Sequence, residues 1–75
     1  MTGIADERVV VTVEDQHLPM IETVANALRL AGMNVTNVMP TVGTITGEVS
    51  HANMIALAKV AGVVAVEPDQ EMNTI

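Results

Sequence analysis

Few side chains in this 75-residue sequence could act as nucleophiles or bases. The chain has one serine (Ser50), one lysine (Lys59), two histidines (His17 and His51) and no cysteine. Ser50 precedes a helical pattern and is expected to cap it, and both histidines stand at expected helix starts. Two histidines without a third convergent ligand do not define a zinc site, and a chain this short has little room for a desolvated lysine. We therefore expect no enzyme, no metal and no cofactor.

A second distinctive group of residues lies near the carboxyl end. Glu67, Asp69 and Glu71 alternate with Pro68 and Gln70, directly after an apolar run. Pro68 disfavours a helix, so an extended segment is expected that could add main-chain hydrogen bonds to a strand of another protein. The carboxylates could dock at helix N-termini of such a partner. The alternative is an acidic, solvated tail that frays.

The elements that must position these residues follow from hydrophobic periodicity. Alternating or β-branched runs predict strands at 8–14, 33–39, 44–49 and 63–67. Apolar stripes of period 3.6 predict helices within 15–32 and 51–62, with Gly32 and Gly62 as left-handed exits. The order β-α-β-β-α-β with right-handed crossovers predicts an α+β, ferredoxin-like fold: a four-stranded antiparallel sheet with two helices on one face. We expect one domain over 1–67 and an extended tail over 68–75.

The other face of this sheet is expected to be open. Gly47, on the apolar side, suggests that a helix approaches closely there. The open face should be small and almost uncharged, where a solvated face normally carries Lys, Glu and Arg, and this favours a protein partner. The alternative is that Thr and Val are present for β-propensity alone. The residues expected on this face are Val10, Thr12, Thr44, Thr46, Val63 and Ala65.

Composition limits the classes of partner. The net charge of −6 would repel polyanions, and the chain has no aromatic residue on which bases could stack. Nucleic acid and anionic membranes are therefore not expected as partners. No signal peptide or long apolar segment is visible, so the protein as encoded is expected in the cytoplasm. Action outside the cell is kept as an alternative.

The segment "TITGEVSHANMIALAKVAGVVAVEPDQ" resembles the propeptide-type inhibitors of subtilisin-like serine proteases, a family of protease pro-domains and small free-standing inhibitors. The resemblance rests on an apolar strand that contains glycine, a short helix with a leucine near its end, and a "GV-x-x-VE-x-D" pattern. The residues that match this pattern are Gly62, Val63, Val66, Glu67 and Asp69. More loosely, the likeness extends to the whole βαββαβ layout.

The resemblance implies a mechanism of inhibition. In that family the open sheet face packs on two parallel surface helices of the protease, and acids after the last strand cap those helices; Glu67 and Asp69 match these acids. The tail then enters the active-site cleft as a product mimic. By position, Met72, Asn73, Thr74 and Ile75 would occupy the cleft, with Ile75 in the specificity pocket. Eight extended residues from Pro68 reach about 26 Å, which is long enough. Such a module could also assist protease folding.

A different class of function also fits the sequence. The open face would serve a homodimer as readily as a protease, so the alternative is a small regulatory or interaction domain that self-associates through its sheet. A metal or small-ligand carrier ranks last, because no convergent ligand set is present.

Overall fold

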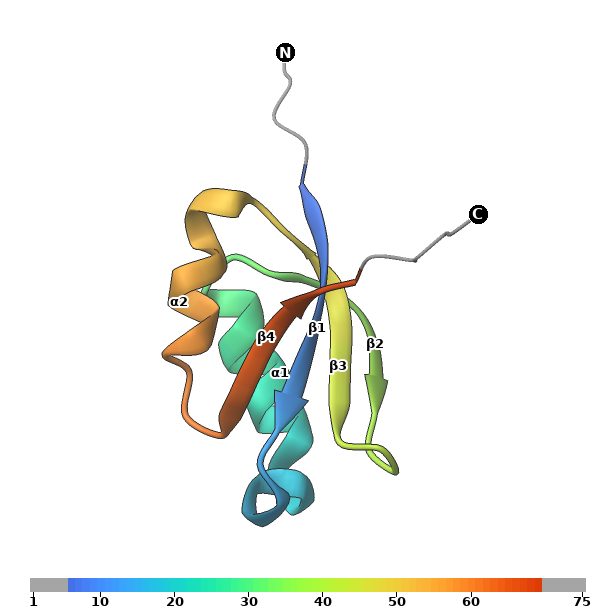
Figure 1. Cartoon of the computed structure of the whole chain (residues 1–75). Helices are drawn as coiled ribbons and strands as arrows, with labels where there is room; N and C mark the ends of the chain where they lie inside the picture. The colour runs from blue at the N-terminus through green and yellow to red at the C-terminus, as the bar shows by residue number, and fades with distance from the viewer. Residues whose placement is uncertain (1–5, 70–75) are drawn as a thin grey trace, which may run out of the picture.

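The computed structural model describes residues 6–69 as one four-stranded antiparallel sheet with two helices on one face (Figure 1). The strands are β1 (Glu7–Val13), β2 (Asn34–Met39), β3 (Thr44–Val49) and β4 (Val63–Pro68). The helices are α1 (Ile21–Leu30) and α2 (Met54–Ala58), each preceded by a 3-10 turn, η1 (Asp15–Met20) or η2 (His51–Asn53). The sheet order β2-β3-β1-β4 is that of the predicted ferredoxin-like fold.

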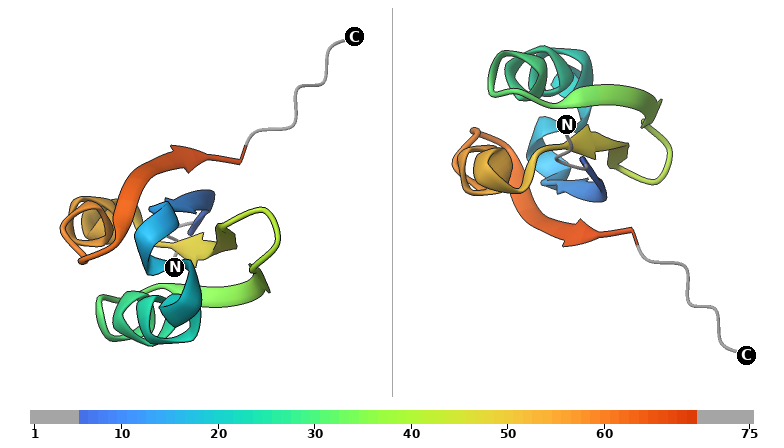
Figure 2. Two further views of the ribbon diagram at one scale, coloured as in Figure 1. Left: turned by 90° about the horizontal axis from the view of Figure 1, so that it is seen from below. Right: turned by 90° about the horizontal axis from the view of Figure 1, so that it is seen from above.

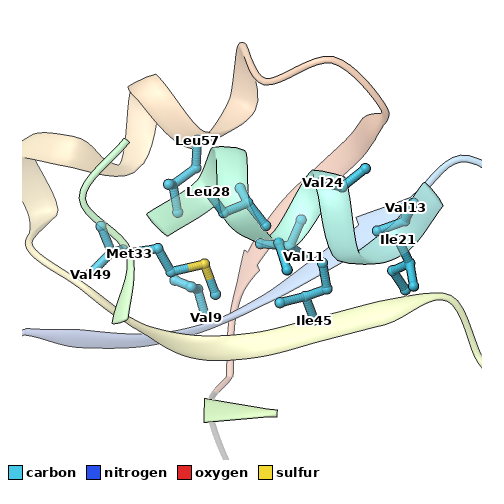
Figure 3. Close-up of a cluster of buried hydrophobic side chains, with 11 residues drawn as sticks. Val9, Val11, Val13, Ile21, Val24, Leu28, Met33, Ile45, Val49 and Leu57 are labelled. Atoms are coloured by element: carbon cyan, nitrogen blue, oxygen red, sulfur yellow. The ribbon is translucent and has the colours of Figure 1, made fainter. Parts of the chain in front are cut away.

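The core lies between the sheet and the helices (Figure 3). Alternate residues of β1 and β3 point into it, as the period of two in their sequences predicts. From α1 it takes the stripe at i, i+3, i+4 and i+7, and from the short α2 only Leu57. The buried core side chains are Val9, Val11, Val13, Ile21, Val24, Ala25, Leu28, Met33, Ile45, Val49 and Leu57.

The helices are shorter than the sequence pattern suggests. Pro19 lies in η1 and has no N–H to donate, so the regular α-helix begins only at Ile21. Ser50 occupies the N-cap position of η2, but its side chain makes no capping hydrogen bond there. The positive φ expected at both glycines is confirmed, at +107° for Gly32 and +94° for Gly62. Gly32 is the left-handed exit of α1, but α2 already ends at Ala58, so Gly62 lies in the turn into β4 and the prediction that it ends the helix is wrong.

Gly47 faces the core side as predicted, but the neighbour that approaches it is not a helix. A Cβ at this position would overlap the carbonyl oxygen of Asn34 and come within 3.0 Å of the Met33 Cε atom. The close approach is therefore made by the beginning of β2, the neighbouring strand.

No helix among residues 6–69 is long and apolar enough to cross a membrane.

Candidate protein-docking surface

The face of the sheet that the helices leave uncovered carries three rows of side chains across the four strands. The pairing register defines each row, because residues opposite one another in a sheet point to the same side. We call these the charged row, the middle row and the turn-side row, and together the docking face. The charged row contains Asn34, Glu48, Arg8 and Asp69. The middle row contains Asn37, Thr46, Val10 and Glu67. The turn-side row contains Met39, Thr44, Thr12 and Ala65.

The docking face is polarised along the strands. The turn-side row has no charge, and its four side chains are all partly buried by their neighbours. The charged row has three ionisable residues, with Arg8 between Glu48 and Asp69, and Asp69 is exposed. A partner would therefore meet a close-packed, uncharged surface at one end and acidic groups at the other.

Five of the six residues predicted for the open face lie there: Val10, Thr12, Thr44, Thr46 and Ala65. Val63 does not, and that prediction is wrong. Val63 lies opposite Val13 and packs against the core, because the register between β1 and β4 shifts by one residue at this point. Thr12 pairs with Ala65, so Val64 is the extra residue of a β-bulge, and it is exposed.

Sequence reasoning missed the contribution of β2 to the docking face. Asn37 and Met39 lie opposite Thr46 and Thr44, and a second irregularity, between Val35 and Asn37, sets this register. The Thr36 side chain at the irregularity donates a hydrogen bond to the Thr46 carbonyl oxygen at 3.2 Å. A signal was available for Met39, because the hairpin turn 40–43 places the residues on either side of it opposite each other.

Glu67 and Asp69 project from the same side of the sheet. They are two residues apart on an extended strand, so their Cα atoms are separated by about 7 Å. The pairing of β4 continues beyond the predicted domain end at 67, because Pro68 lies opposite Val9 and the Asp69 N–H donates to the Arg8 carbonyl at 2.8 Å. Both side chains are exposed. Within residues 6–69 neither carboxylate makes an ion pair, so both are available to a partner.

The backbone edges of the sheet are less suited to docking. The Asp69 hydrogen bond makes Arg8 and Asp69 a hydrogen-bonded pair, so Pro68 and Val66 direct their main-chain groups away from β1. Pro68 offers no N–H on this free edge, and the bulge at Val64 interrupts it further. On the opposite edge, β2 is interrupted at Thr36. The docking face is therefore the surface better formed for a partner.

The two histidines contact glutamates at the two ends of β1. His51 Nδ1 lies 3.1 Å from Glu7 Oε2, in a hydrogen bond on the surface. His17 Nδ1 lies 3.3 Å from Glu14 Oε1, without hydrogen-bond geometry, and the His17 ring packs on Gly62. The His51 contact links η2 to β1, whereas the His17 contact stays within η1 and its N-cap. Among residues 6–69 no three His, Asp or Glu side chains are grouped to hold a metal, and no pocket is found.

The predicted cleft-binding residues Met72, Asn73, Thr74 and Ile75 lie outside the described residues. Comparison of the chain with protein-family models, with curated proteins and with solved structures found no match.

Proposed function

We propose that this protein binds and inhibits a subtilisin-like serine protease, with the docking face against the protease and residues 70–75 directed into its active-site cleft. The observation that carries the proposal is the arrangement of β4. Glu67 and Asp69 stand unpaired among the described residues, on the same side as the docking face, and the chain continues from them toward residues 72–75. A protease that receives the face therefore also meets the two carboxylates.

Different parts of the docking face make different kinds of contact with the protease. The turn-side row offers an uncharged surface made of Met39 and three small side chains, against which a helical surface packs closely. Glu67 and Asp69 supply acceptors for the unsatisfied N–H groups at helix N-termini, where the helix dipole also favours anions. The segment after Asp69 occupies the cleft as a product would. The same contacts would assist folding of the protease, because a module that binds only the folded protease stabilises the folded state.

Self-association through the same face is the competing proposal, and two features of the chain weigh against it. Each copy carries a net charge of −6, so association of copies is opposed electrostatically. Both sheet edges are interrupted, which disfavours edge-to-edge pairing. Analytical ultracentrifugation at micromolar concentration is expected to give a monomer. A tight dimer whose formation is blocked by Thr12→Arg would favour the self-associating domain instead.

The test of the proposal is a charge placed in the docking face. Thr12 lies in the turn-side row between Thr44 and Ala65 on the central strand. Thr12→Arg is expected to raise the inhibition constant for subtilisin about a hundredfold, because a long cation in the uncharged row prevents close packing and must be desolvated on binding. The matched control is Thr23→Arg, an exposed position on the helix layer, which should leave inhibition unchanged. Equal inhibition by the two variants would contradict docking through this face.

A further inference from the structure

The exposed large apolar side chains of the described residues fall into two groups. Leu30 and Ile55 belong to α1 and α2. Met20, Val42 and Val64 belong to η1, the β2–β3 turn and the beginning of β4, which are all at the lower end of the molecule in Figure 1 but are spread across the width of the sheet in Figure 2. Of the three rows, the turn-side row lies nearest this end. The carboxylates Glu67 and Asp69 lie toward the opposite end of the sheet.

The turn that carries Val42 is held firmly in place. The Gly43 N–H donates to the Met39 carbonyl, and the Val13 N–H donates to the Gly43 carbonyl, both at 2.8 Å. Gly43 has a φ of +79°, and the Leu18 side chain covers it so closely that a Cβ there would lie 3.1 Å from Leu18 Cδ2. Val42 is nevertheless 69% exposed. It is thus an apolar side chain presented by a fixed backbone, which reduces the entropy cost of binding through it.

The turn also continues the docking face. Met39 and Thr44, the residues that flank it, are the β2 and β3 members of the turn-side row. The segment 39–44 contains no charged residue. In both views of Figure 2 this turn lies away from the two helices. The uncharged surface therefore runs from the turn-side row to the tip of the turn without interruption by an ionisable group.

We propose that Val42 is an anchor of the docking face, received by an apolar recess on the same protease partner, beyond the end of the helices that the sheet covers. This inference rests on the proposed function and adds a second point of attachment at the end of the sheet far from the carboxylates. Interface anchors are most often aromatic or arginine. This chain has no aromatic residue, and Arg8 lies in the charged row at the other end of the docking face, so at the turn a rigidly presented aliphatic side chain is the anchor available.

The experiment compares two equally exposed apolar residues on opposite sides of the molecule. Val42→Ser removes the proposed anchor, and Ile55→Ser, at 70% exposure on α2, is the matched control. Val42→Ser is expected to raise the inhibition constant for subtilisin about tenfold, and Ile55→Ser less than about twofold, with unchanged circular dichroism for both. An equal effect of the two substitutions would overturn the inference while the proposed function stands. A parent protein that does not inhibit would overturn the proposed function, and the inference with it.

Discussion

Neutralising Glu67 and Asp69 tests the electrostatic part of the account. The two carboxylates are exposed on the docking-face side of β4 and have no ion-pair partner within residues 6–69. The double substitution Glu67→Gln and Asp69→Asn removes both charges and keeps the shape of the side chains. It also keeps the hydrogen bond from the Asp69 N–H to Arg8, because that bond is made by the main chain.

The expected loss follows from the number of contacts. An anion at an exposed helix N-terminus contributes about 0.3–1 kcal/mol, so two such contacts contribute about 0.6–2 kcal/mol. Since 1.4 kcal/mol corresponds to a factor of ten, the inhibition constant for subtilisin should rise about 3- to 30-fold. The loss should shrink as salt rises above about 0.15 M, where the Debye length is about 8 Å.

The assay is a titration of subtilisin activity on a chromogenic peptide, at two salt concentrations. The control is Asp15→Asn with Glu22→Gln, which removes the same net charge from exposed positions on η1 and α1. If both double variants weaken inhibition equally, the effect is general attraction of a basic partner and not local docking. If the Glu67 and Asp69 variant inhibits as well as the parent, the reasoning about helix N-termini is refuted.

Two further predictions concern the fold. Leu57 is the only buried residue of α2, so Leu57→Ala should lower the free energy of unfolding by about 2–5 kcal/mol, a large part of the roughly 4–11 kcal/mol typical for a domain of this size. Urea denaturation measures this, and Ile55→Ala on the same helix should cost under about 0.5 kcal/mol, since Ile55 is exposed. Gly47→Ala should destabilise by about 1–3 kcal/mol, because the new Cβ overlaps the Asn34 carbonyl oxygen; a neutral result in the same assay would show that β2 shifts at no cost.

The fold was predictable because strand and helix periods are distinct in this chain. The alternation of Val9, Val11 and Val13, and the stripe through Ile21, Val24 and Leu28, predict the core that the structure has. The strand order then follows from the connections between the elements and their handedness. The positive φ of Gly32 and Gly62 was predictable for a similarly local reason, although only Gly32 lies at a helix exit.

The details of the docking face were less predictable, because they depend on register between strands. A period of two assigns Val63 and Ala65 to one face, but the extra residue at Val64 turns Val63 toward the core. The second irregularity, near Thr36, decides which β2 residues join the face. Gly47 signals close packing, but nothing in the sequence says whether a helix or a strand is the neighbour. Bulges of this kind carry no composition signal of their own.

The central claim is that the domain positions residues 72–75 in the cleft of a subtilisin-like protease. The most direct measurement is the inhibition constant for subtilisin of the chain with and without Met72–Ile75, under identical conditions. The account predicts that the intact chain inhibits competitively and that the truncated chain, still bound by its docking face, is weaker by at least about tenfold. Equal potency of the two forms, or no inhibition by the intact chain, would contradict it.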